Sequence, residues 1–551
     1  MTRRLRRTWQ ASILGCVLGL SGCAHPTQPP RMTHRSEPSR GPDASPKEPL
    51  DWAPFDARTF ERAKRERKFI VLDGSAEWCH WCHVMESTTY HDAKVASVLQ
   101  RHFIAAKVDV DARPDIEERY RAWGWPATVI FSPDGDELGK YRGYMAPGEF
   151  ADLLAAVVAA GPNAARVEAA AERPTPDTPL AAETLAWAAH WAEVELEEYW
   201  DPKEGGWGVE PKVPIHENTE FALKRATRGD TRLREHALTV LEKQRNIIDP
   251  VWGGIYQYSV APDWVHPHFE KLMEFNAGAL ADYAAAYTLT HDERWLRAAR
   301  DIDRYLRAFM ISPEGGFHGT QDADLNAHDR EKRFMDGHDY YRLGDRERRA
   351  LGVPRVDPNE YAEDGGLAIA AYVTLYEATR DASALAIAKR ASARVAATHT
   401  APRGGITHGI ETEPPRLLHL ADHAAYGYAL ARLHDVEPDA ATLAAAKRVA
   451  DFALAELYDP NQGGFYTHTR DPDAVGVFQR RRKPFNENML MLRFLVKLRS
   501  KLQGTGPTTE YAKAIDKSLR YWTDPERMKD AGRFIGDYLS LVDEISSPSR
   551  K

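Results

Sequence analysis

The sequence predicts a multidomain protein: an α/β domain followed by an all-α domain built as an (α/α)6 toroid. Three observations support this prediction. Short apolar segments alternate with helical segments between residues 50 and 160. Strand signals then nearly disappear, and long Ala- and Leu-rich helical segments follow from about residue 180. Among these helices, a loop phrase that contains Pro and Gly-Gly occurs five times, which is typical of a repeat architecture.

The first 22 residues have the pattern of an export signal. Four arginines precede the apolar run Ala11–Leu20, which is about half as long as a membrane-spanning helix. The next segment, LSGC, resembles a bacterial lipobox, in which the cysteine is acylated and becomes the new N-terminus. We therefore expect a lipoprotein signal peptide over residues 1–22 and lipidation of Cys23; an ordinary cleaved signal peptide is the alternative.

These features predict an exported bacterial lipoprotein at the periplasmic face of a cell membrane or at the cell surface. A lipid chain, rather than a transmembrane helix, would attach it to the membrane. Residues 23–49 are rich in Pro, Ser, Arg and Gly, and we expect them to form a disordered tether.

The α/β domain is expected over residues 50–160. Its apolar segments, bounded by turn residues, predict buried strands in a sheet that is covered on both faces. In chain order we expect a helix over 55–67, a strand over 68–74, a helix over 82–102, a strand over 103–111, a helix over 114–123, two strands within 126–144 and a helix over 149–160. The turn of the last strand pair is Pro133-Asp134-Gly135.

A linker is expected over residues 161–179 and the toroid over residues 180–546. The repeated phrases are DPKEGGWG at 201, DPVWGGIY at 249, SPEGGFHG at 312, APRGGITH at 401 and DPNQGGFY at 459. Their spacing is near 60 residues, which fits two helices and two loops, with an insertion at about 318–358 in the longest gap. Five phrases and a final helical stretch predict six helix pairs that close into a ring.

The segment GSAEWCHWCHVM, residues 74–85, contains the cysteines that remain after the signal peptide and the lipidation site are set aside. Cys79 and Cys82 lie between a predicted strand and a predicted helix, where free N–H groups and the helix dipole stabilise a thiolate. We expect Cys79 to be the nucleophile and Cys82 to resolve the mixed disulfide. Two alternatives stay open: covalent haem, because the segment contains C-x-x-C-H, and zinc bound by both cysteines, His83 and a further ligand.

Residues 71–79 resemble the thioredoxin strand that leads into the active site, and residues 106–131 resemble the next thioredoxin strand, helix and cis-proline strand. The resemblance covers about residues 52–158 and implies a thioredoxin-like fold. It implies that Asp73 is buried and assists proton transfer from Cys82, and that a cis Trp125–Pro126 bond places Pro126 beside the dithiol. Because His80-Trp81 replaces the Gly-Pro of thioredoxins, we expect a couple more oxidising than thioredoxin's potential of about −270 mV.

The chain as a whole resembles the spermatogenesis-associated thioredoxin-like proteins, which join such a domain to a six-hairpin glycosidase-like toroid. The resemblance rests on CHWCHVME at 79, PLDWAPF at 49, GGWGVEPKVP at 205, the segment 253–280 that contains HPHFEKLMEFN, GGFHGTQDAD at 315, and LADHAAYGYALARLHD at 420. The sequence departs from the family at NEYAEDGGLAIAAY, residues 359–372, and in the insertion after Asp324.

The resemblance to sugar-binding toroids directs attention to polar residues at loop-like positions. Glycoside hydrolysis needs two carboxylates, and the candidates for a toroid pocket are Glu270, Asp322, Asp324 and Asp364. His268 is a candidate for the proton transfer of a sugar 2-epimerase. The alternatives are helix capping by the acids and structural hydrogen bonding by the histidine. Three loop tryptophans, at 207, 252 and 264, either stack on a sugar or pack the end of the barrel.

The predicted function is therefore an exported thiol–disulfide oxidoreductase with an accessory toroid, acting on protein dithiols or disulfides. A carbohydrate-active enzyme with its chemistry in the toroid, and a module that binds glycans or peptides, are the alternatives. The net charge of −8 gives no basic footprint for nucleic acid, and we expect no bound cofactor.

Overall fold

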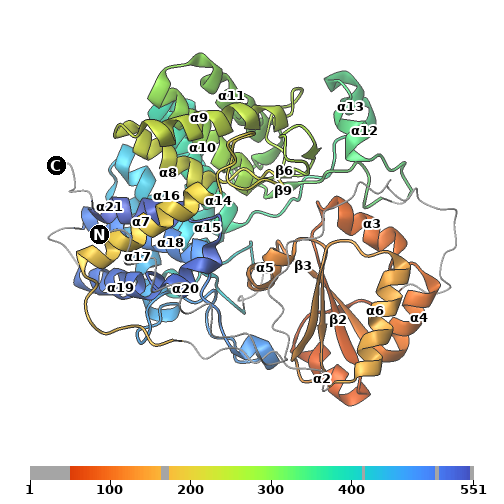
Figure 1. The fold of residues 1–551 in the computed structure, drawn as a ribbon. Coiled ribbons are helices and arrows are strands. Elements are labelled where there is room, and N and C mark those ends of the chain that lie inside the picture. The colour runs from red at the N-terminus through yellow and green to blue at the C-terminus, as the bar shows by residue number, and fades with distance from the viewer. Residues whose placement is uncertain (1–49, 163–172, 330, 412–415, 503–507, 547–551) are drawn as a thin grey trace. The chain divides into compact units, whose positions relative to one another are not determined.

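The computed structural model describes residues 50–162, 173–329, 331–411, 416–502 and 508–546 (Figure 1). These residues belong to one compact unit of the chain. The predicted signal peptide, Cys23 and the tether lie outside the described residues, as does part of the predicted linker. The domain boundaries named above stay a prediction.

The α/β part contains a five-stranded sheet with the strand order β1-β3-β2-β4-β5. Its strands are β1 (Ala53–Pro54), β2 (Phe69–Ser75), β3 (Phe103–Asp109), β4 (Ala127–Phe131) and β5 (Glu137–Arg142). Strands β1, β3 and β2 are parallel, whereas β4 and β5 are antiparallel to their neighbours. The predicted strands are all present, and the sheet is mixed because the last two strands form a hairpin.

The helices of this part are α2 (Ala57–Glu66), α3 (His80–Thr88), α4 (Ala93–His102), α5 (Pro114–Tyr120) and α6 (Pro147–Ala160). They pack on the sheet, with α4 and α6 side by side (Figure 1). The expected continuous helix over 82–102 is two helices instead. The chain breaks after α3, and the side chain of Asp92 caps α4 by accepting hydrogen bonds from the N–H groups of Lys94 and Val95.

Alternating residues of β2 pack into two separate apolar cores. Ile70 and Leu72 lie in the core that also contains both cysteines, whereas Phe69 and Val71 lie in the core under α4 and α6. All seven residues of this strand are buried. The buried apolar run of the sequence therefore reflects a central strand covered on both faces, which holds its C-terminal end rigidly beside α3.

Within the described residues, the remaining long helices form six contacting pairs. The inner helices are α8 (His216–Thr227), α10 (Met273–Thr290), α14 (Ala362–Thr379), α16 (Leu420–Val436), α18 (Phe485–Lys501) and α21 (Gly536–Ser546). Their outer partners are α9 (Thr231–Gln244), α11 (Glu293–Tyr305), α15 (Ala382–Thr398), α17 (Ala440–Glu456), α19 (Thr508–Trp522) and α7 (Ala182–Glu198). Each inner helix contacts the next, and α21 contacts α8, so the ring closes. The predicted (α/α)6 toroid is confirmed.

Short elements connect the pairs. The small strands are β6 (Tyr258–Ser259), β7 (Pro267–His268), β8 (Lys271–Leu272) and β9 (Thr320–Gln321), which pair as β6–β7 and β8–β9. The short helices are α12 (Gly337–Tyr341), α13 (Asp345–Leu351) and α20 (Pro525–Met528). The predicted insertion contains β9, α12 and α13.

The five Gly-Gly phrases form one recurring turn. In each phrase the first residue donates its N–H to the carbonyl of the second glycine, as in Asp201 to Gly206 and Asp459 to Gly464, both at 2.9 Å. The residues that flank the turn pair as an isolated β-bridge, for example Trp200 with Trp207 and Tyr458 with Phe465. The first glycine of every phrase has a positive φ, for example 81° at Gly463, which explains why this position requires glycine.

Aromatic residues at these turns are part of the core. Trp207, Trp252 and Trp264 are all buried in the main apolar cluster of the helical part. The Trp252 indole N–H donates to Asp345, and that of Trp264 donates to the Gly205 carbonyl. The three loop tryptophans therefore pack the barrel end, and the alternative of an exposed sugar-stacking surface is not supported for them. Among the described residues, every helix is too short or too polar to span a lipid bilayer.

Candidate active site

The two cysteines form a disulfide at the N-terminus of α3, directly after β2. Cys79 is the N-cap residue, and its sulfur accepts a hydrogen bond from the Cys82 backbone N–H at 3.1 Å. In the reduced state the same N–H group and the helix dipole stabilise a thiolate on Cys79. The geometry therefore distinguishes a sulfur at the helix start, which accepts from a backbone N–H, from a second sulfur one turn further on.

Asp73 lies in β2 below this helix and is buried. Burial raises its pKa to about 6, while the nearby charge of Lys107 and the Tyr90 hydroxyl act in the opposite direction. The Asp73 Oδ1 atom accepts no hydrogen bond from the described residues. A carboxyl group with this pKa takes up and releases protons near neutral pH, as the predicted relay requires.

The peptide bond between Trp125 and Pro126 is cis, as the resemblance to thioredoxins implies. Pro126 directly precedes β4, which pairs with β2 through Ala127 and Gly74. The Trp125 ring lies so close to Gly74 that a Cβ atom added to this glycine would be 3.1 Å from the ring. The cis bond thus lies at the same end of the sheet as the disulfide.

His80 directly follows Cys79. It contacts two acidic side chains of the helical part. Its Nδ1 atom lies 2.8 Å from Asp324 Oδ2, and its backbone N–H donates to Glu270 Oε1 at 3.3 Å. Burial opposes protonation of His80, but the hydrogen bond and charge of Asp324 outweigh it and raise the pKa to about 9. The contact with the Asp324 carboxylate therefore favours the imidazolium form of His80 at neutral pH.

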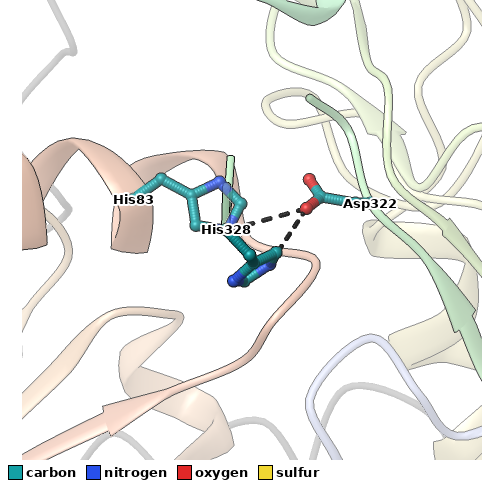
Figure 2. A group of neighbouring side chains, drawn as sticks. All are labelled: His83, Asp322 and His328. Carbon is teal, nitrogen blue, oxygen red and sulfur yellow. Dashed lines mark ion pairs between the residues drawn. The ribbon is translucent and has the colours of Figure 1, made fainter. Parts of the chain in front are cut away.

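His83 lies one turn further along α3 and joins a second group of polar atoms. Its Nδ1 atom lies 3.2 Å from Asp324 Oδ2, and its Nε2 atom lies 2.9 Å from the Glu77 carbonyl. Figure 2 shows His83, Asp322 and His328 pointing toward one another, with ion pairs from Asp322 to both rings. Burial raises the pKa of Asp322 despite the nearby His83.

The helical part covers the disulfide. Cys79 and Cys82 are 4% and 6% exposed, and Leu272 and Phe275 belong to the apolar cluster around them. The Ala323 N–H donates to the Trp78 carbonyl at 3.4 Å, and the Trp78 indole N–H donates to Asp111 at 2.8 Å. The loop that contains Asp322 and Asp324 therefore lies directly against the residues that precede the first cysteine.

Four of the five residues predicted for a toroid pocket thus gather at the disulfide. His268 contacts Glu270, Glu270 contacts His80, and Asp322 and Asp324 contact the two histidines of the CHWCH segment. Asp364 lies elsewhere, in the first turn of α14, where burial raises its pKa to about 7 although His408 opposes this.

A large cavity lies among the inner helices, and Glu117 and Glu118 of α5 also line it. Its volume is about 1580 Å³. None of the five predicted pocket residues is among its described lining residues, which include Glu217, Glu274, Glu363 and the ion pair between His216 and Asp282.

Sequence reasoning missed two polar residues near the disulfide. His328 lies in the insertion that departs from the family pattern, so no family motif pointed to it. Asp111 ends the segment after β3, and its backbone carbonyl lies 2.7 Å from His408 Nε2. The position of Asp111 just after a buried parallel strand was an available signal, because strand ends of one sheet lie near each other.

The fold and the site together define a class of protein: a thioredoxin-like domain with a C-x-x-C disulfide, joined to a six-hairpin helical toroid. Residues 41–158 match the family described as Thioredox_DsbH, protein of unknown function (DUF255). The chain is also 34% identical over 84 residues to a thioredoxin H-type of Fagopyrum esculentum, covering 15% of this chain and 68% of that protein. Through its α/β domain the chain belongs to the thioredoxin family.

The resemblance to the spermatogenesis-associated thioredoxin-like proteins is confirmed. The chain is 28% identical over 341 residues to spermatogenesis-associated protein 20 of Homo sapiens, which covers 55% of this chain and 43% of that protein. The chain thus spans less than half the length of this curated relative. A third relative is thiol:disulfide interchange protein DsbD 1 of Pseudomonas aeruginosa, 31% identical over 143 residues, or 24% of this chain and 22% of that protein.

Solved structures match the helical part at the level of the fold. The structure of cellobiose 2-epimerase from Spirochaeta thermophila superposes with a TM-score of 0.50 and 14% identity, covering 68% of this chain and all of that chain. A family 76 glycoside hydrolase of Bacteroides thetaiotaomicron has a TM-score of 0.45 and 13% identity, covering 76% of this chain and 82% of that chain.

Proposed function

We propose that this protein is a thiol–disulfide oxidoreductase whose redox centre is the Cys79–Cys82 pair. The observation that carries this proposal is the disulfide at the start of α3, with the Cys82 N–H directed at the Cys79 sulfur. The buried carboxyl of Asp73 and the cis bond before Pro126 complete the set of groups that such chemistry uses. The relatives named as thioredoxin and as thiol:disulfide interchange protein support the same assignment.

The chemistry follows from the positions of these groups. In the reduced protein the Cys79 thiolate attacks one sulfur of a substrate disulfide, which forms a mixed disulfide and releases the other substrate sulfur as a thiolate. Cys82 then transfers its proton to Asp73, attacks Cys79 and releases the second substrate thiolate. The substrate is reduced by two electrons and the pair returns to the disulfide that the structure contains. The reverse sequence oxidises a substrate dithiol.

A redox assay with matched cysteine variants tests this proposal. We expect the full-length chain to equilibrate with glutathione and to reduce insulin in the presence of dithiothreitol, and we expect Cys79→Ser to abolish both. Cys82→Ser should instead accumulate a mixed disulfide, because the attacking sulfur remains and the resolving sulfur is gone. Equal rates for wild type and Cys79→Ser would refute the proposal.

We also propose export and lipidation at Cys23, which rest on the N-terminal sequence alone. Labelling with a radioactive or alkynyl fatty acid during bacterial expression tests this: label should enter the wild-type protein and be absent from Cys23→Ser. Incorporation into both proteins would rule out Cys23 as the attachment site.

A second candidate function belongs to the cavity of the toroid. Its carboxyl groups include Glu217, whose pKa burial raises to about 7, and Glu220, whose pKa stays well below its ordinary value because the charge of Arg493 outweighs burial. A raised and an ionised carboxyl group are the pair that glycoside hydrolysis uses, and polyhydroxylated ligands bind such groups by hydrogen bonds. The cavity is large enough for an oligosaccharide, and the toroid fold is shared with the sugar-converting enzymes named above.

A glycan-binding measurement separates this candidate from the first. Binding of an oligosaccharide to the cavity should be weakened by Glu217→Gln and unchanged by Glu270→Gln, because Glu270 lies at the disulfide and outside the cavity lining. Release of a reducing sugar by wild type would add catalysis to binding. Identical binding by both variants would place the ligand elsewhere.

A further inference from the structure

Four ligand atoms from two distant parts of the chain converge beside the disulfide. They are Nε2 of His83 in α3, Nε2 of His328 and Oδ2 of Asp322 in the loop after β9, and the backbone carbonyl of Glu77. Each atom comes from a group that binds transition-metal ions. Figure 2 shows the three side chains directed toward a common centre.

The ligand atoms of His83, Asp322 and His328 lie within 4.8 Å of one another, close enough for one small ion, whereas the Glu77 carbonyl lies at hydrogen-bond distance from both rings and would move outward when an ion binds. A tetrahedral zinc ion with bonds of 2.0–2.1 Å separates its ligands by roughly 3.3 Å. Here the Glu77 carbonyl lies 2.9 Å from His83 Nε2 and 2.7 Å from His328 Nε2. Asp322 Oδ2 lies 3.2 Å from His328 Nε2 and 3.8 Å from His83 Nε2.

The hydrogen bond of His83 Nδ1 determines whether Nε2 of the neutral ring carries a proton or a lone pair. Asp324 Oδ2 lies 3.2 Å from His83 Nδ1, and a carboxylate only accepts, so Nδ1 carries the proton. In a neutral His83 the Nε2 atom then presents a lone pair to the Glu77 carbonyl, which is itself an acceptor. A carboxylate that holds the outer nitrogen of a histidine is the usual partner of a metal-ligating histidine.

Protons alone leave one buried oxygen without a donor. If both histidines carried a proton on Nε2, both N–H groups would be directed at the Glu77 carbonyl at 2.9 and 2.7 Å. Asp322 Oδ2 accepts no hydrogen bond from the described residues, although the Asp322 side chain is only 1% exposed. A buried carboxylate oxygen that pairs with two imidazoles outside hydrogen-bond geometry needs positive charge beside it, and one metal ion bound to all three groups would supply that charge.

We propose that His83, Asp322, His328 and the Glu77 carbonyl form a binding site for a divalent transition-metal ion of the zinc class. Two imidazoles and one carboxylate favour this class over Mg²⁺ and Ca²⁺, which prefer all-oxygen sites. The proposal does not depend on the redox activity of the cysteines, because neither sulfur is a ligand. The ion would tie the segment before Cys79 and the first turn of α3 to the loop after β9.

The experiment is a titration of the oxidised, untagged full-length chain with Zn²⁺ by calorimetry and with Co²⁺ by visible absorption. Oxidation keeps both sulfurs in the disulfide, so that a site built from the cysteines cannot form. We expect one ion per chain and a tetrahedral Co²⁺ spectrum without thiolate charge transfer. Thermal denaturation with and without Zn²⁺ gives an independent readout, because an ion that binds only the folded state raises the midpoint.

Variants locate the ion. His328→Gln should weaken Zn²⁺ binding by at least about tenfold, and Asp324→Asn by about 10- to 100-fold, because a neutral amide oxygen accepts from His83 Nδ1 more weakly than a carboxylate does. The matched control is His266→Gln, which removes an exposed histidine that pairs only with Asp263 among the described residues. His328 is 34% exposed, so its replacement leaves the fold intact and the test valid even if Asp322→Asn fails to fold.

Three results would overturn the proposal. They are the absence of Zn²⁺ binding to the oxidised wild type, equal affinity of wild type and His328→Gln, and equal loss of binding in His266→Gln.

Discussion

At the scale of single residues, the chemistry of the site depends on charges placed within one turn of Cys79. Asp73 supplies a buried acid from the sheet below, and the helical part supplies Asp324 and Glu270 from the other side. In thioredoxins a glycine follows the first cysteine, whereas here that residue is His80, whose backbone N–H donates to Glu270 and whose ring pairs with Asp324. The sequence alone shows this replacement, but it does not show which carboxylates contact His80.

Replacing Asp73 tests both the proton relay and the cost of its burial. The folded-state pKa of about 6 lies above the ordinary value of 3.8, so the stability linked to protonated Asp73 is fully present below pH 3.8 and is lost as the pH rises through 6. At pH 7.5 Asp73→Asn should therefore be more stable than wild type by roughly 3 kcal/mol. The groups that face Asp73 are Lys107, Tyr90 and Glu86, and they remain in the variant.

The same variant should lose activity while it gains stability. Disulfide reduction by Asp73→Asn should fall by roughly 10²-fold at pH 7, because Cys82 loses its proton acceptor. The measurements are denaturation midpoints at pH 3.5 and 7.5 and single-turnover reduction at pH 7. A stability gain that is equally large at pH 3.5 would show that ionisation of Asp73 is not its cause.

Glu270 provides a test of how the helical part sets the redox potential. A carboxylate that accepts from the first N–H of α3 disfavours a thiolate at the same helix end, and so disfavours the reduced form. Glu270→Gln should therefore raise the reduction potential by roughly 10–30 mV. Equilibration with glutathione measures it, and Asp301→Asn, on the outer helix α11, is the control. A fall in potential would contradict this account.

At the scale of elements, the Gly-Gly turns are held by polar residues of the inner helices. Asn488 Oδ1 accepts from the Phe465 N–H at 2.6 Å, and its Nδ2 donates to the Phe465 carbonyl at 2.9 Å. Asn276 does the same for Ile255, and His423 Nε2 accepts from the Ile406 N–H. Buried lysines complete three turns: Lys212, Lys271 and Lys483 pair with the first Asp of their phrases.

Removing one of the polar side chains that bond the Gly-Gly turns should destabilise the toroid. Asn488→Ala leaves the backbone N–H and carbonyl of Phe465 buried without this partner, which should cost about 2–4 kcal/mol. Asn461→Ala, at an exposed position on the same turn, should change stability by less than about 0.5 kcal/mol. Thermal denaturation followed by far-ultraviolet circular dichroism compares the two. Equal effects would mean that the side chain of Asn488 does not stabilise the turn.

At the scale of the whole molecule, the helical part controls access to the disulfide. The sulfurs are almost completely buried, and Leu272 and Phe275 from the start of α10 contribute to the cluster around them. If the protein is the oxidoreductase proposed above, a folded substrate protein needs this cover to open before a sulfur–sulfur contact forms. The structure thus adds a steric condition to an otherwise thioredoxin-like centre.

Weakening the cover should speed reduction of the disulfide. If Phe275→Ala destabilises the covered state of the disulfide by about 1.4 kcal/mol relative to the open state, the population of the open state rises about tenfold. The rate of reduction by a small phosphine should then rise by the same factor. Phe309→Ala removes the same side chain from the helical core, where it packs on Trp252, and is the control. Unchanged rates in Phe275→Ala would show that the cover does not limit access.

The sequence by itself determined the features that depend on neighbours along the chain. The strand, the helix start, the C-x-x-C pair, Asp73 and the cis bond before Pro126 lie within short segments whose geometry follows from local backbone preferences and a recognisable pattern. The five Gly-Gly phrases likewise determined the number of helix pairs, because each turn is built from its own residues and a cap one helix away.

Only the tertiary structure decided which loops meet the disulfide. Glu270, Asp322 and Asp324 have the composition of sugar-pocket acids, yet they lie beside His80 and His83, about 190 or more residues away in the chain. Where such residues lie depends on how the ring closes and which of its loops pack against α3. These long-range contacts arise from the burial of shared apolar surface, which no local pattern encodes.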